Sequence, residues 1–343
     1  MRERKTDMKL ARLTFRWLFA TAICVALAPS AGAFTWPTSG TATIPAGETV
    51  IVTDADYDAV NALDEITISD GGTNIFETSK APTTQIKGSG AWVKRGNATW
   101  TLSTAQGTFY GSFIIEAGVV TNAISTGKGG VWCNDYDRHT FTIKEGAMFV
   151  NTATDSGISF GPHRMHIAGS GVNGEGAIVH RANKGFSLTK LKLDGDAKIT
   201  STHTSGSFTL GPYSSTSGRC ELRGHTLTID TKSYTTMYRS ELVGDEGGLI
   251  RVTSGDLVFG AESGKDNPFL CIEPNAGAFA MAHSGTIHIK RDMPNIEVPL
   301  TIESGADVTL KHYHESYVSD CTYNVNSNAW NGNVTVEAGA ILR

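Results

Sequence analysis

The chain has 343 residues, with 38 glycines, 10 prolines, 18% charged residues and a formal net charge of -5. Proline and charge are too scarce for a disordered chain, and glycine does not follow the Gly-X-Y period of collagen. No basic excess exists that could neutralise a nucleic-acid backbone. Glycine scattered among threonine, serine, valine and isoleucine is typical of strands and turns, so we expect an all-β protein without a nucleic-acid partner.

Residues 1–33 have the pattern of a cleaved secretory signal. Arg12 and Arg16 precede the apolar run 17–28, and Ala31 and Ala33 supply the small residues that signal peptidase requires. That run is too short to span a bilayer and no later run is longer, so we expect no transmembrane span in the mature chain. Without the signal, 23 basic residues stand against 32 acidic ones, a net charge of -9 that disfavours acidic or phosphate-bearing partners.

Residues 34–70 are expected to form an N-terminal cap region. In the segment 54–65, Val60 and Leu63 lie three apart and acids come early, as in a short amphipathic helix that could cap the open end of stacked strands. The acids of this segment also have the oxygen spacing of an EF-hand calcium loop, although Ala59 stands where that loop needs glycine. A calcium site and the solvated start of a helix therefore both stay open. The candidate ligands are Asp54, Asp56, Asp58 and Glu65.

Residues 71–343 are expected to form a β-solenoid, passenger-like region. One short phrase recurs along the mature chain: an aliphatic residue, a charged residue, a small residue, glycine, then alanine or valine. Clear copies are 115–119, 143–147, 302–306 and 336–340. Each copy is typical of a strand end, a turn in which glycine can take a positive φ, and the start of another strand. Twelve such turn glycines have a mean spacing of about 26 residues, a period typical of a solenoid. They are Gly47, Gly71, Gly90, Gly118, Gly146, Gly171, Gly195, Gly224, Gly255, Gly277, Gly305 and Gly339.

Between these turns, short strands alternate apolar and polar residues, so each strand can bury one face. The clearest strands are 99–102, 113–115, 141–143, 191–193, 226–229, 286–289 and 334–336. A unit of this size cannot bury its apolar face alone and must stack on its neighbours. The sequence therefore predicts an all-β solenoid, a parallel β-helix of about a dozen coils.

Residues 88–122 resemble the autotransporter-associated β-strand repeat of bacterial surface passenger domains. The resemblance rests on Gly88-x-Gly90-x-Trp92-x-Lys94-x-Gly96, Trp100-x-Leu102-Ser103 and Phe109-Tyr110-Gly111-x-Phe113-x-Ile115-x-x-Gly118-x-Val120. It implies a right-handed, pectin-lyase-like parallel β-helix in an exported protein, and it implies no reaction. The β-barrel of that family has no counterpart near the C-terminus, so an outer-membrane anchor would come from further chain or from a partner.

Two glycine motifs are similar to enzyme signatures, but their surroundings favour turns. Residues 169–174 match the GxGxxG dinucleotide fingerprint, and Asp194 stands where a ribose-binding acid would be needed, yet the following residues begin a strand. Residues 157–161 match the GxSxG nucleophile elbow, yet residues 165–167 continue directly towards another glycine turn. We therefore interpret both motifs as turns and expect no cofactor.

Two clusters are candidates for chemistry. Asp135, Asp137 and His139 share one strand face, as the paired acids of a glycosidase would. The signatures of the β-helix polygalacturonases are absent, so this site is the lesser alternative. His312 and His314 would place two imidazoles on one strand face, which either forms a weak transition-metal site with a third ligand or is simply surface histidine.

Cys133, Cys220, Cys271 and Cys321 remain after removal of the signal, and none lies in a CxxC motif. The last three are 51 and 50 residues apart, near two coils each. Sulfurs in one column would then lie about 9 to 10 Å apart, beyond disulfide reach, so we expect free thiols at these three positions.

The sequence favours an exported, noncatalytic β-helix located at the cell surface, in the outer membrane or outside the cell. Its expected role is adhesion or glycan contact, with surface glycans or host or cell-envelope proteins as partners. The alternative is a polysaccharide lyase or glycoside hydrolase on the same fold.

Overall fold

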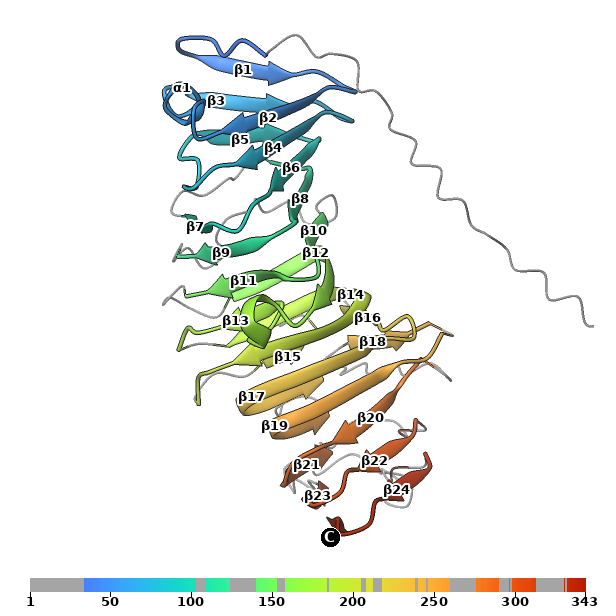
Figure 1. The fold of residues 1–343 in the computed structure, drawn as a ribbon. Helices are drawn as coiled ribbons and strands as arrows, with labels where there is room; N and C mark the ends of the chain where they lie inside the picture. Colours follow the sequence, from blue (N-terminus) through green and yellow to red (C-terminus); the bar gives the residue numbers. More distant parts are fainter. Residues whose placement is uncertain are drawn as a thin grey trace, which may run out of the picture. The chain divides into compact units, whose positions relative to one another are not determined.

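The computed structural model describes residues 34–102, 109–123, 140–152, 158–183, 185–204, 208–211, 218–237, 240–244, 246–259, 276–289, 296, 298–312, 330 and 332–343. The chain divides after Thr35, and the account below concerns the unit Trp36–Arg343. In this unit successive strands pair only in parallel, each with the equivalent strand of the next coil. The predicted parallel β-helix is therefore confirmed (Figure 1).

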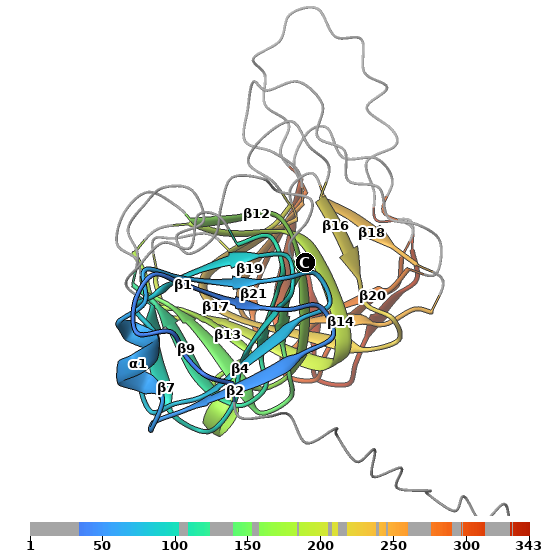
Figure 2. The same ribbon diagram turned by 90° about the horizontal axis from the view of Figure 1, so that it is seen from above.

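Each complete coil contributes strands to three faces in turn, and these enclose a common interior (Figure 2). The first face holds β1 (Thr41–Ile44), β3 (Glu65–Ile68), β5 (Gln85–Gly88), β15 (Phe208–Leu210), β21 (Gly285–Ile289), β23 (Asp307–His312) and β25 (Ile341–Leu342). The second face holds β2 (Thr49–Thr53), β4 (Thr73–Glu77), β6 (Ala91–Lys94), β8 (Ser112–Ile115), β10 (Thr140–Ile143), β16 (Gly218–Glu221) and β18 (Ser240–Val243). The third face holds β7 (Thr99–Leu102), β9 (Gly118–Asn122), β11 (Ala147–Asn151), β13 (Ile178–His180), β20 (Ala278–Met281), β22 (Leu300–Ile302) and β24 (Val334–Val336).

Four longer strands turn a corner and belong to more than one face. They are β12 (Ile158–Gly169), β14 (Phe186–Ser201), β17 (Thr226–Met237) and β19 (Leu249–Phe259). The strand β14 runs through all three faces, because it pairs in succession with β15, β16 and β17. All seven strands predicted from the alternation lie within described strands.

The turn glycines largely behave as the repeated phrase predicts. Nine of the twelve have a positive φ between 70° and 82°, a conformation that glycine adopts without steric cost. The other three are Gly90, Gly195 and Gly277. Gly90 is needed for a different reason, since a Cβ there would collide with the side chain of Ile68 and with neighbouring backbone oxygens.

Aromatic side chains fill the interior of the coils around residues 88–122. Trp92 is fully buried, and its ring centroid lies 4.7 Å from Phe113, 6.0 Å from Phe109 and 6.5 Å from Trp100. A second cluster joins Phe259, Phe279 and Trp330 in later coils, with centroids 5.1 to 5.9 Å apart. Because large rings bury much apolar area, these clusters hold neighbouring coils together.

The predicted helix is present but short. Helix α1 covers Tyr57–Asn61, and the segment from Asp54 to Glu65 is otherwise turn and strand. It connects β2 to β3 and so lies within the first coil, where its Val60 is fully buried. In the part of the chain that is described, no helix is long and apolar enough to cross a membrane.

Cys220 is a buried free thiol in β16, as predicted. Burial, with a smaller contribution from Glu221, raises the pKa of this thiol to about 12, so the side chain behaves as an inert core residue. The other three cysteines of the mature chain lie outside the described residues.

Candidate functional site

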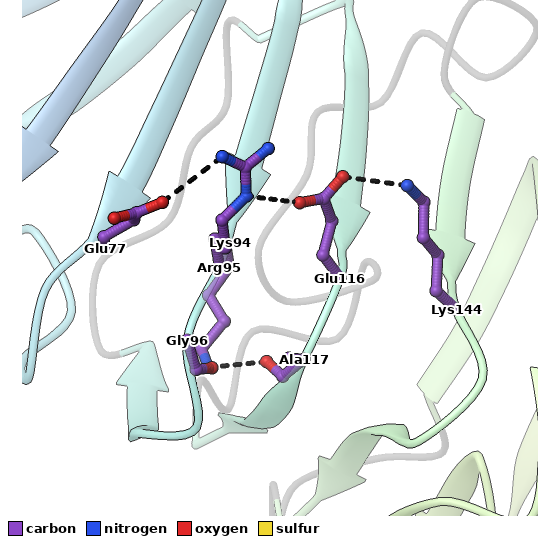
Figure 3. A network of polar contacts seen from close by, with 7 residues as sticks. All are labelled: Glu77, Lys94, Arg95, Gly96, Glu116, Ala117 and Lys144. Carbon is purple, nitrogen blue, oxygen red and sulfur yellow. Dashed lines mark hydrogen bonds and ion pairs between the residues drawn. The ribbon is translucent and has the colours of Figure 1, made fainter. Parts of the chain in front are cut away.

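The first candidate site is built around a lysine that points into the core. Lys94 is the last residue of β6 and is fully buried. Its Nζ donates hydrogen bonds to the carbonyl oxygens of Gly96, at 2.5 Å, and Ala117, at 2.6 Å (Figure 3). These carbonyls belong to the turns after β6 and β8, so the amine joins equivalent turns of two successive coils.

The surroundings of Lys94 explain both its position and its altered acidity. Burial lowers the pKa of Lys94 to about 8, because the low-dielectric interior disfavours the charged form. A Cβ on Gly118 would collide with the Lys94 Nζ, so glycine at that position leaves the space that the amine occupies. The Nζ also lies 5.9 Å from the ring centroid of Trp100. With its hydrogens directed to turn carbonyls, this amine is suited to fastening coils and not to attacking a substrate.

A ladder of alternating charge crosses four coils on the outside of the same corner. Arg95 lies 3.2 Å from Glu77 and 2.6 Å from Glu116, and Lys144 lies 2.8 Å from the other oxygen of Glu116 (Figure 3). We call Glu77, Arg95, Glu116 and Lys144 the corner ladder. Each residue comes from the next coil, immediately after a strand of the second face or at its end.

The pKa values within the corner ladder follow from its contacts. The hydrogen bond to Glu116 raises the pKa of Arg95. Burial alone would raise the pKa of Glu116, but hydrogen bonds from Lys144 and Arg95 outweigh it and hold that pKa below its ordinary value. Exposed ion pairs contribute little individually, so the ladder acts mainly as a network that links neighbouring coils.

A row of buried, hydrogen-bonded polar side chains lies inside the third face. Asn122, Asn151 and His180 occupy equivalent positions in successive coils and are all buried. Asn122 Nδ2 lies 3.3 Å from Asn151 Oδ1 and donates to it, and Asn151 Nδ2 lies 2.9 Å from His180 Nδ1. With Asn151 donating through Nδ2, His180 accepts at Nδ1 and carries its proton on Nε2. Such a chain favours one register of coil stacking.

The proposed calcium ligands bind different protein groups and do not converge. Asp54 accepts hydrogen bonds from the backbone N–H and hydroxyl of Ser79, the first of which is the main cause of its lowered pKa. Asp56 accepts from the N–H and hydroxyl of Thr53. Glu65 forms an ion pair with Lys87, whose hydrogen bond lowers the pKa of the carboxyl. Asp58 lies exposed in the first turn of α1.

Within the described ranges, no three histidine, cysteine, aspartate or glutamate side chains are grouped so that they could hold a metal ion. The backbone of His312 ends β23, while its side chain and all of His314 lie outside the description. Asp135, Asp137 and His139 also lie outside the described residues.

The glycine motif at residues 169–174 is a turn, as its context indicates. Gly169, Gly171 and Gly174 all have positive φ, and the short 3-10 helix η1 (Val172–Gly174) leads to the strand β13. Val172 of this segment packs on an apolar cluster formed by Met148, Val150 and Val179. In the GxSxG stretch, residues 158–161 continue as the strand β12, so no helix follows the serine.

No family model, curated protein or solved structure matches the chain. The site must therefore be interpreted from its own geometry. The sequence indicates the position of Lys94 through strand alternation, which places it on the same side as Trp92 and so makes it an inward-facing lysine.

Proposed function

We propose that the mature chain is an exported, noncatalytic β-solenoid that serves as a passenger or stalk segment with an adhesive or glycan-contacting surface. The observation that carries this proposal is that polar side chains of one coil bind groups of the neighbouring coils along the parallel stack. Lys94, Arg95 and Glu116 all bind groups of the preceding or the following coil. Side chains committed to such contacts are suited to holding a scaffold in shape, and an adhesive role needs a long, stable surface.

The signal-like segment and the resemblance of residues 88–122 to the autotransporter-associated repeat support the export part of the proposal. Export can be tested by expressing the full chain in a bacterium and measuring the mass of the protein outside the cytoplasm. We expect a chain that begins at Phe34, after removal of residues 1–33. A chain that keeps Met1 and stays in the cytoplasm would overturn export.

The noncatalytic part is tested with a panel of neutral and acidic polysaccharides. We expect binding without the appearance of new reducing ends or unsaturated sugars. A matched variant, Asp135→Ala with Asp137→Ala, serves as the control for catalysis. Turnover by the wild type that disappears in this variant would replace the proposal with a lyase or hydrolase.

A further inference from the structure

The outer surface of the second face carries three cations in register. Arg164 of β12 pairs with Lys190 of β14, which in turn pairs with Arg219 of β16. Neighbouring strands lie about 4.8 Å apart, so the three side chains form a line along the stacking direction. We call Arg164, Lys190 and Arg219 the basic row.

The row faces outward, because the residue that follows each cation along its strand is buried. Met165 and Cys220 are fully buried and Leu191 is 2% exposed, while Arg164 and Arg219 are exposed and Lys190 is half-buried. His166 and Lys192 form a second line beside the row, two residues further along each strand. The surface therefore presents nitrogen donors on three adjacent strands.

Acidic residues neutralise only part of this array. Glu221 lies 2.7 Å from Arg219, and Asp194 accepts from Arg223 at 3.0 Å and lies 3.1 Å from His166. Lys190 also makes an interaction within the protein. Among the described residues, neither Arg164 nor Lys192 has an ion-pair partner. The row ends where Glu241 follows Arg219 in the register.

The position of the row is unusual within its own face. At the equivalent positions of the two preceding coils stand Ser112 and Thr140, so the cations are not a general feature of the second face. A chain whose mature net charge is acidic nevertheless gathers cations here. Arg164 and Lys192, which have no ion-pair partner among the described residues, offer their charge to an anionic ligand.

We propose that the basic row, flanked by His166 and Lys192, binds a linear acidic polysaccharide laid across β12, β14 and β16. The inference rests on the proposed glycan-contacting function and names its substrate class. An extended chain with repeated carboxylates can meet one cation in each coil, and the planar guanidinium groups of Arg164 and Arg219 match carboxylate geometry. The described outward positions of these strands carry no phenylalanine, tyrosine or tryptophan, which disfavours single-stranded nucleic acid because such sites stack bases mainly on these rings.

The test measures binding of alginate, which carries one carboxylate per sugar, and of its propylene-glycol ester, in which the same backbone has lost the charge. We expect the wild type to bind alginate and not the ester. The triple variant Arg164→Gln, Lys190→Gln and Arg219→Gln should bind alginate at least about tenfold more weakly, and its binding should depend less on salt. A control variant removes three exposed lysines elsewhere: Lys80→Gln, Lys232→Gln and Lys311→Gln. This control should bind within about twofold of the wild type, since its net charge matches that of the triple variant.

The outcomes separate this inference from the proposed function. Unchanged binding by a folded triple variant, or equal binding of alginate and its ester, would overturn the basic row as the site. Equal binding of oligothymidylate through the same residues would overturn the glycan assignment in favour of a general polyanion site. Binding of neutral glycans alone would overturn this inference but leave the proposed function, whereas binding of no glycan and no cell surface would overturn both. Circular dichroism and thermal melting establish that each variant is folded.

Discussion

The corner ladder and the basic row use the same stacked geometry in opposite ways. In the corner ladder, the sign of the charge alternates from Glu77 to Lys144, so each coil attracts the next. In the basic row, Arg164, Lys190 and Arg219 repeat one sign at the same spacing. The comparison teaches that the order of the charges along this fold influences their use. A row that alternates in sign is satisfied within the protein and is a candidate for structure, whereas a row that repeats one sign and keeps Arg164 without an ion-pair partner among the described residues is a candidate for binding.

The largest expected effect tests whether the corner depends on the space kept for Lys94. We expect Gly118→Ala to lower the free energy of unfolding by about 3 kcal/mol or more, since a Cβ would collide with Lys94 and with the Ala98 carbonyl at a residue of positive φ. The matched control is Gly146→Ala, which has a similar φ but open space around the added Cβ. It should cost only about 1 kcal/mol. Denaturant unfolding measures both losses. Equal losses would show that the space kept for Lys94 does not stabilise this corner.

The second effect concerns the charge on Lys94. Its pKa is about 8 in the folded protein against an ordinary value of 10.5, so between these values the unfolded chain binds more protons. The free energy of unfolding should therefore rise with pH across this window, by about 3 kcal/mol. The neutral amine keeps two N–H donors, enough for the Gly96 and Ala117 carbonyls.

Lys94→Met, which cannot titrate, should lack this rise. The difference between the two proteins, measured by denaturant unfolding from pH 7 to pH 10.5, cancels the titration of other groups. A difference that does not change with pH would contradict a buried ammonium at this position.

The third effect compares one arginine from each row. Arg95→Gln removes the central cation of the corner ladder and should lower the free energy of unfolding by about 1 kcal/mol, less at high salt. Arg164→Gln removes an end of the basic row and should change stability by no more than about 0.5 kcal/mol, or raise it slightly, because Lys190 loses a like-charged neighbour. Thermal and denaturant unfolding at two salt concentrations would show it. A larger loss for Arg164→Gln than for Arg95→Gln would break the comparison.

The smallest expected effect concerns the acids of residues 54–65. Calcium and EDTA should leave the melting temperature unchanged, because Asp54, Asp56 and Glu65 already accept protein hydrogen bonds or an ion pair. Like the carboxylates of the corner ladder, they bind protein groups, which belong to the same coil or to the next one. A melting temperature that rises with calcium and falls with EDTA would instead place a metal at this segment.

The sequence predicted those features that are set by neighbouring residues. Alternation along a strand and a glycine in each turn are local, and the strands and most turn glycines are confirmed. Helix α1 is shorter than the segment 54–65 predicts. Asp54 and Glu65 bind residues of the next coil and are not part of the helix. The basic row could not be predicted, since its register joins residues 26 and 29 positions apart. The negative net charge of the whole chain even predicts against a basic site.

The parallel register has a consequence for the length of the molecule. Each coil contacts chiefly its neighbours, so stability is nearly a sum of coils and of the interfaces between them. Ala147 stands directly beside Gly118, and Met148 beside Val119, in adjacent coils. Joining Gly118 to Met148 would therefore remove one whole coil while keeping every later side chain on its own face. In this fold length is modular. A protein of this kind can gain or lose whole coils without redesign of the coils on either side.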